Sequence, residues 1–289
     1  MPELKQMSEA NNWSIQETHD RLKAYYDGYH FSRRNMVDVY NPYSLVNALK
    51  SKEIINFWAS SGATSLLPKF VDNAELRLSK FENCSVMRNT LELSDVSGGG
   101  AELFLYQSGY LTIKESDEFG YILGFPNEEV KQALYETVLP ALAMRSENEI
   151  QSLQAGLYRE LGTGQIDEAM NSLKALIADV PYSNKKLASM DMEERYRLII
   201  STIMNAIGLS VEVEKMISTG RIDMTVKTSR YIYVIELKLR NNGGKEAATE
   251  QILNRQYMEP FKADKRKVIG LGIELDEEGK GLLDWTRVE

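Results

Sequence analysis

Two carboxylates and a lysine near the C-terminal end of the sequence have residue types that suit metal-assisted phosphate chemistry. Asp223 comes first, and Glu236 and Lys238 follow within one short stretch of chain. Carboxylate oxygens are the ligands that Mg²⁺ prefers. A divalent ion can stabilise transition-state charge and activate water, and a neighbouring lysine can orient or deprotonate that water. These residues therefore suit a Mg²⁺ or Mn²⁺ site that acts on a phosphate group.

The elements around these residues are expected to be two paired strands. Residues 231–239 alternate in a period of two, which places Glu236 and Lys238 on the same face at the end of an otherwise apolar strand. Asp223 lies in residues 221–227, which also alternate. A short turn between the two strands would bring Asp223 close to the other two residues.

A longer pattern of helices and strands surrounds this pair. Periodicity predicts the order helix, three strands, helix, strand over the last hundred or so residues. The final β-α-β crossover should be right-handed and leave the last strand parallel to the third. The expected elements are a helix at 190–207, strands at 209–217, 221–227 and 231–239, a helix at 245–261 and a strand at 267–273.

Two short runs carry a resemblance to a known superfamily. Gly220-Arg221-Ile222-Asp223, followed by Ile235-Glu236-Leu237-Lys238, resembles the active-site signature of the PD-(D/E)XK nucleases. The predicted order of elements also matches the core of that superfamily. The resemblance implies a metal-dependent nuclease that cleaves nucleic acid, with DNA as the expected substrate.

The resemblance also implies roles for individual residues. Asp223 and Glu236 would be metal ligands, and Lys238 would be the catalytic lysine. Glu194, on the first helix, matches a position where many members carry an additional acidic residue. Gln251, on the following helix, matches a polar position near the site.

Other interpretations of these residues stay open. An aspartate, a glutamate and a lysine on adjacent strands can form a surface ion pair that contributes little to stability. Glu194 and Gln251 can be solvated positions on helix faces. The domain can also be a catalytically inactive interaction or regulatory module of an ATPase system.

The N-terminal part is expected to be mostly helical, with a small β-hairpin at 110–123 that could belong to a winged-helix module. Several of its segments resemble the C-terminal portion of predicted AAA-type ATPases, which carry a PD-(D/E)XK domain and occur in anaerobic bacteria. The resemblance implies an ATPase module as a partner in cis or in trans. The segments are YYDGYHF (25–31), VYNPYSLVNAL (39–49), LFLYQSGYLTI (103–113) and FPNEEV (125–130).

The phosphate-binding loop of such ATPases is missing from the sequence. That loop needs a G-x-x-x-x-G-K-[ST] run whose backbone amides cradle phosphates. Gly279 and Lys280 are followed by Gly281, and Glu274 stands where the first glycine should be. We therefore expect no ATPase activity from this chain by itself.

Composition and charge predict the domain organisation and the cellular compartment. The fold class is predicted to be α+β, with an ATPase-associated helical region at 1–180, a nuclease-like α/β domain at 181–289, and a boundary in segment 178–186. The net charge is −8, and its acidic excess lies in the first part, which argues against general nucleic-acid binding there. A single cysteine, no signal peptide and no membrane-length apolar run predict a cytoplasmic protein without membrane partners.

Overall fold

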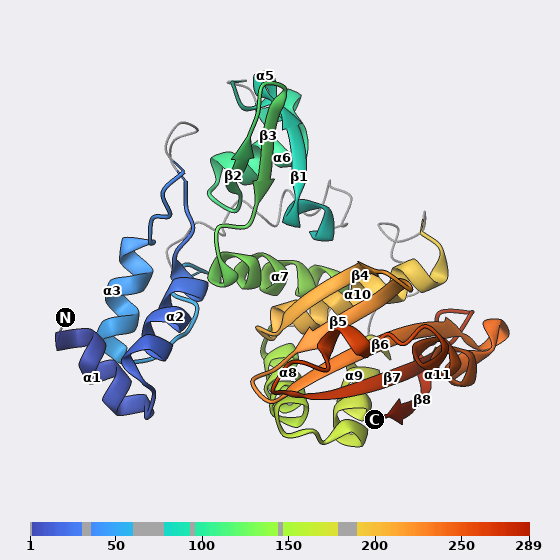
Figure 1. The fold of residues 1–289 in the computed structure, drawn as a ribbon. Helices are drawn as coiled ribbons and strands as arrows, with labels where there is room; N and C mark the ends of the chain where they lie inside the picture. The colour runs from blue at the N-terminus through green and yellow to red at the C-terminus, as the bar shows by residue number, and fades with distance from the viewer. Residues whose placement is uncertain (1, 31–35, 60–77, 93–95, 144–146, 179–189) are drawn as a thin grey trace. The chain divides into compact units, whose positions relative to one another are not determined.

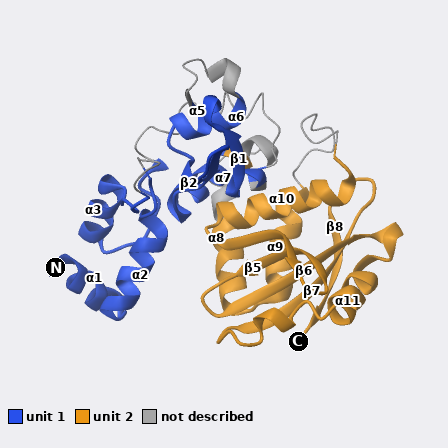
Figure 2. Cartoon of the chain, turned by 45° about the horizontal axis from the view of Figure 1, so that its top comes forward, with its two compact units in different colours: residues 1–137 blue, residues 138–289 orange. Residues whose placement is uncertain are grey.

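The computed structural model describes residues 2–30, 36–59, 78–92, 96–143, 147–178 and 190–289. The chain forms two compact units, Met1–Thr137 and Val138–Glu289, which we term the N-terminal and C-terminal units (Figure 2). Helices and strands occur in both units, as the α+β prediction requires (Figure 1). No helix among the described residues is long and apolar enough to cross a membrane.

The first part of the N-terminal unit is helical. Helices α1 (Pro2–Asn11), α2 (Ile15–Tyr26) and α3 (Pro42–Ser51) share a small apolar core formed by Met7, Leu22, Tyr26 and Ala48. Helix α3 begins where the sequence predicts, because the Asn41 side chain accepts hydrogen bonds from two backbone N–H groups of the first turn.

The second part of this unit contains a three-stranded sheet. The expected hairpin is present as β2 (Thr112–Ser116) and β3 (Gly120–Gly124), and a third strand, β1 (Cys84–Met87), pairs with β3. Strand β1 was not expected, because four residues are too few to show an alternating pattern. The sheet order β1-β3-β2 leaves the winged-helix prediction unconfirmed. The accompanying helices are η3 (Leu78–Glu82), α5 (Arg88–Glu92), α6 (Val96–Gln107) and α7 (Glu128–Ala143), and the last residues of α7 belong to the C-terminal unit.

The C-terminal unit is built on a five-stranded mixed sheet of order β4-β5-β6-β7-β8. The expected helix and three strands are present, and β6 and β7 are parallel, as predicted from the crossover. The second helix, α11, is shorter than expected, and the final strand β8 was not predicted. The elements are α10 (Met192–Ala206), β4 (Ser210–Ile217), β5 (Gly220–Lys227), β6 (Tyr231–Leu239), η5 (Arg240–Asn242), α11 (Gly244–Asn254), η6 (Glu259–Phe261), β7 (Lys267–Leu275) and β8 (Leu282–Val288).

Two further helices belong to this unit. Helices α8 (Glu147–Thr163) and α9 (Ile166–Ala178) pack against each other, and the Tyr233 hydroxyl of β6 donates a hydrogen bond to the Leu161 carbonyl at 2.6 Å. This compact unit begins at Val138, and the predicted domain boundary at 180/181 lies within it. The predicted linker 178–186 falls almost wholly in residues 179–189, which lie outside the described residues.

Helices cover both faces of the sheet. Helix α11 lies over β6 and β7 and shares an apolar cluster in which Ile232 and Val234 meet Ile252 and Tyr257. The approach is close because β7 presents glycine at position 272. A Cβ there would lie 2.8 Å from the backbone nitrogen of Thr249 and would have to displace the helix. This packing brings the middle of α11 next to the end of β6.

Candidate active site

The pairing of β5 with β6 determines where the two predicted carboxylates lie. The antiparallel register places Met224 opposite Ile235, so Asp223 and Glu236 are the next residues on each strand. Asp223 Oδ2 accepts a hydrogen bond from the backbone N–H of Leu237 at 3.0 Å. The carboxylate of Asp223 is thus held beside the strand that carries Glu236 and Lys238.

Glu236 is a buried carboxylate with incomplete hydrogen bonding. The residue is 1% exposed. Its Oε1 accepts hydrogen bonds from Lys238 Nζ at 3.3 Å and from Gln251 Nε2. Its Oε2 is buried and has no hydrogen-bond partner. Because an unpartnered buried oxygen is costly, this atom is suited to a ligand such as a cation.

The protonation equilibria of the two carboxylates are linked. Burial, and next the negative charge of Asp223, raises the pKa of Glu236 to about 7. Burial also raises the pKa of Asp223, while the Leu237 N–H and the Arg197 guanidinium oppose that shift. Two close, desolvated carboxylates resist simultaneous ionisation unless a positive charge joins them.

These side chains open into a cleft of about 610 Å³ at one end of the sheet. The cleft combines acidic and basic groups with one tyrosine, and α10, β5, β6 and α11 all contribute to it. The lining residues are Glu193, Arg197, Gly220, Arg221, Asp223, Glu236, Lys238, Ala247, Glu250, Gln251, Asn254, Arg255 and Tyr257.

The acidic residue that α10 contributes to the cleft lining is Glu193, the neighbour of the expected residue, Glu194, whose role stays a prediction. Glu193 Oε1 accepts hydrogen bonds from the Leu239 backbone N–H at 3.3 Å and from Asn242 Nδ2 at 3.1 Å. Glu194 is not among the residues that line the cleft. Adjacent helical residues point about 100° apart, so Glu193 and Glu194 lie on different faces of α10.

Gln251, on α11, contacts the carboxylate of Glu236. Its amide donates to Glu236 Oε1 and also contacts the Tyr257 hydroxyl at 3.2 Å, and that hydroxyl donates to the Arg221 carbonyl at 2.9 Å. The amide therefore connects α11 to the carboxylate. Its part in chemistry stays a prediction.

Arg197 is a site residue that the sequence reasoning missed. Its Nη1 donates to Asp223 Oδ1 at 3.3 Å and to Glu214 Oε1 at 2.8 Å. The available signal was helical spacing, because Glu193 and Arg197 are four residues apart and share one face of α10.

The donor set fits a hard divalent cation. Two carboxylates from adjacent strands, one with an unpartnered oxygen, offer the oxygen ligands that Mg²⁺ uses. Among the described residues, no group of three or more His, Cys, Asp or Glu side chains is arranged to hold a metal. The remaining ligands would therefore be water and substrate oxygens.

A comparison with protein families covers the region that contains this cleft. Residues 191–285 match the family model described as PD-(D/E)XK nuclease superfamily. This region is a PD-(D/E)XK nuclease superfamily domain. The match begins at the N-cap of α10 and ends within β8, so it covers four strands of the sheet and part of the fifth.

A curated relative extends over more of the chain. An uncharacterized protein from the vnfD 5′ region of Azotobacter chroococcum mcd 1 is 26% identical over 280 residues, which cover 92% of this chain and 52% of the relative. The chain thus spans about half the length of that relative. No solved structure matches the chain. The predicted association with AAA-type ATPases has no support in these comparisons.

Members of the PD-(D/E)XK superfamily are typically nucleases, so a test of Glu193 against its neighbour is informative. We expect Glu193→Ala to lower cleavage about tenfold, the lower end of losses for groups that support a metal site. Glu194→Ala should stay within about twofold of wild type, because Glu194 is outside the cleft lining. Initial rates of nucleic-acid cleavage measure both, and equal losses would contradict the assignment.

The raised pKa of Glu236 predicts how metal affinity depends on pH. A carboxylate binds a cation when ionised, so Mn²⁺ affinity should rise with pH through about 7. Without metal, Glu236 in the folded protein keeps its proton to a higher pH than its ordinary pKa of 4.5 would allow. Its contribution to stability is therefore present below about pH 4.5 and is lost as pH rises through 7.

Calorimetric titrations with Mn²⁺ at pH 6 and pH 8 measure this dependence. Thermal unfolding of the metal-free protein from about pH 4.5 to about pH 8 measures the stability contribution, with Glu236→Gln as the reference that lacks the titrating group. Equal Mn²⁺ affinity at the two pH values would contradict the assignment of Glu236 as a ligand.

Proposed function

We propose that this protein is a divalent-metal-dependent nuclease that hydrolyses phosphodiester bonds of nucleic acid, with DNA as the substrate. The observation that carries the proposal is the convergence of Asp223, Glu236 and Lys238 at one cleft, with the buried Oε2 of Glu236 lacking a partner. The superfamily match of residues 191–285 supports the same chemistry.

Each residue has a distinct part in the proposed reaction. Asp223 and Glu236 would hold Mg²⁺, which supplies charge stabilisation for the phosphate and activation of water. Lys238 Nζ, 3.3 Å from Glu236 Oε1, would orient the attacking water or neutralise the phosphate. Hydrolysis forms one bond from the water oxygen to phosphorus and breaks one P–O ester bond, and the leaving oxygen takes up a proton.

The walls of the cleft suit a polyanionic substrate. Arg221, Lys238 and Arg255 line it and can contact a phosphodiester backbone, whereas Arg197 is held by Glu214 and Asp223. Exposed Arg221 and Arg255 lie at the β4–β5 turn, where Arg255 Nη1 donates to the Thr219 carbonyl at 3.4 Å. This side of the cleft would receive phosphates next to the one that is cleaved.

The test is direct incubation of the chain with nucleic acid. Single- and double-stranded DNA and RNA are each mixed with the protein in Mg²⁺, in Mn²⁺ and in chelator, and products are resolved by denaturing electrophoresis. We expect cleavage of DNA that chelator abolishes. If no substrate is cleaved in either metal, and no Mn²⁺ binds, the interaction-module alternative replaces the nuclease.

An ATPase module as partner in cis or in trans stays a prediction from the resemblance of the N-terminal segments. The chain contains no phosphate-binding loop of the P-loop type. The proposed nuclease therefore does not depend on ATP binding by this chain.

A further inference from the structure

Arg197 is held between two carboxylates rather than directed at solvent. Its side chain is 12% exposed, and its Nη1 donates to Glu214 Oε1 at 2.8 Å and to Asp223 Oδ1 at 3.3 Å. The shorter contact is to Glu214, which does not line the cleft. Arg197 is thus anchored mainly by a residue outside the site and reaches into the site to contact a proposed metal ligand.

The position of Glu214 is unusual for a strand residue. It lies on β4 between residues paired with Met224 and Ile222, and is therefore opposite Asp223. Its φ is +54°, a left-handed conformation that residues with a side chain rarely adopt. Strained backbone of this kind persists where surrounding contacts enforce it, and it clusters at functional sites.

Glu214 also binds a second arginine of the cleft. Arg221 Nη1 donates to the same Oε1 atom at 2.9 Å. One carboxylate oxygen therefore collects two guanidinium groups beside Asp223. An exposed ion pair alone would not need a strained backbone, because such pairs form readily in many geometries and contribute little.

From these contacts we propose that Glu214 is a positioning residue that acts through Arg197. It controls how strongly Arg197 binds Asp223, and hence how well Asp223 binds a divalent ion. The inference rests on the proposed function, because it concerns the same metal site. By drawing the guanidinium toward itself, Glu214 limits the hold of Arg197 on Asp223 Oδ1. When Glu214 is removed, Arg197 pairs with Asp223 alone and competes with a cation for the Asp223 carboxylate.

We term this action of Glu214 on Asp223 through Arg197 the relay. A double-mutant cycle on Mn²⁺ affinity separates the relay from a general charge effect. The four proteins are wild type, Glu214→Gln, Arg197→Gln and the double variant, titrated with Mn²⁺ alone by calorimetry at fixed pH and salt. We expect Glu214→Gln to weaken Mn²⁺ binding about tenfold when Arg197 is present. In the Arg197→Gln background the same change should shift affinity less than about twofold.

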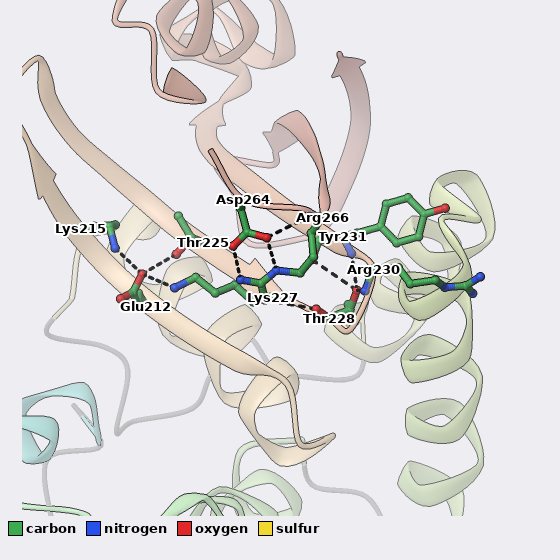
Figure 3. Close-up of polar contacts among 9 residues, drawn as sticks. All are labelled: Glu212, Lys215, Thr225, Lys227, Thr228, Arg230, Tyr231, Asp264 and Arg266. Atoms are coloured by element: carbon green, nitrogen blue, oxygen red, sulfur yellow. Dashed lines mark hydrogen bonds and ion pairs between the residues drawn. The ribbon is translucent and has the colours of Figure 1, made fainter. Parts of the chain in front are cut away.

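The matched control removes a second carboxylate from the same strand. Glu212 lies two residues before Glu214, and its Oε2 accepts from Lys215 Nζ at 2.6 Å and from Lys227 Nζ at 3.2 Å, as Figure 3 shows. The two glutamates have similar side-chain exposure, 41% for Glu212 and 47% for Glu214. Glu212→Gln should leave Mn²⁺ affinity within about twofold of wild type, because Glu212 does not contact Arg197 or line the cleft.

Each outcome decides the question. A loss that depends on Arg197 supports the relay, as does retention of that dependence in Arg197→Lys, which keeps the positive charge. Equal losses from Glu214→Gln in both backgrounds, or a loss in Glu212→Gln as large as in Glu214→Gln, overturn it and indicate long-range charge alone. If the wild type does not bind Mn²⁺, the proposed function and the relay are both overturned. If the wild type binds Mn²⁺ but the effects of the two substitutions are additive, only the relay is overturned.

Discussion

Glu236→Gln is expected to abolish both metal binding and cleavage. Glu236 is buried at the centre of the site, and its Oε2 has no other partner, so an ion bound there depends on this carboxylate. Glutamine keeps the shape and one oxygen but loses the negative charge. A hard divalent ion pays for its lost hydration mainly through charged oxygen ligands.

The same substitution should not destabilise the metal-free protein at pH 8. A buried carboxylate with a pKa near 7 is ionised there at the cost of desolvation and of repulsion from Asp223. The neutral amide removes both penalties, so the melting temperature without metal should equal or exceed that of wild type. Loss of function combined with undiminished stability would identify Glu236 as a residue kept for ligand binding.

Mn²⁺ calorimetry, cleavage assays and thermal melts provide the three measurements. Glu274→Gln is the matched control, because Glu274 lies opposite Lys238 on β7 and its carboxylate pairs with Arg240 outside the cleft. That variant should retain Mn²⁺ binding. A Glu236→Gln protein that still binds Mn²⁺ with wild-type affinity would exclude the metal site as described.

Lys238→Ala should separate chemistry from metal binding. The lysine is at the open end of β6 and its side chain is 22% exposed, so truncation should change the free energy of unfolding by no more than about 1 kcal/mol. Both carboxylates remain, and the removal of a nearby positive charge should leave Mn²⁺ affinity equal or slightly higher. Cleavage should fall about a hundredfold or more, which is the scale of one positioned acid–base or electrostatic group.

Single-turnover rates at saturating metal test this separation, with Mn²⁺ calorimetry on the same protein as the control for binding. Full activity of Lys238→Ala would leave a nuclease in which the lysine has no chemical part. A wild type and a Lys238→Ala variant that are both inactive would instead favour the interaction-module alternative.

The sheet and its two carboxylates were predictable because local sequence carries the needed information. The period of two along β5 and β6 fixes which side chains share a face, and the short turn fixes the register that brings Asp223 to Glu236. The parallel pairing of β7 follows from the intervening helix. The superfamily match to residues 191–285 supports this part of the prediction.

The parts that escaped prediction depend on contacts between distant segments. Strand β8 reads LLDWTRV, and its charged and polar residues give little sign that it completes the sheet beside β7. Which of Glu193 and Glu194 faces the cleft depends on the rotation of α10 about its axis. Packing sets that rotation, and the sequence of two adjacent glutamates does not reveal it. Helical spacing relates Arg197 to Glu193, but its contact with Glu214 joins a helix to a strand, and no local pattern reveals that contact.

Strand β7 contributes no side chain to the cleft, yet its glycine at position 272 determines the geometry of the cleft. Because α11 rests directly on that backbone, the reach of Gln251 to Glu236 is set by the thickness of the layer between helix and sheet. Any larger residue at 272 would raise the helix and withdraw the amide, although every residue of the cleft stayed the same. Variation in related chains should accordingly be freer on the exposed walls of the cleft than on the hidden floor beneath α11.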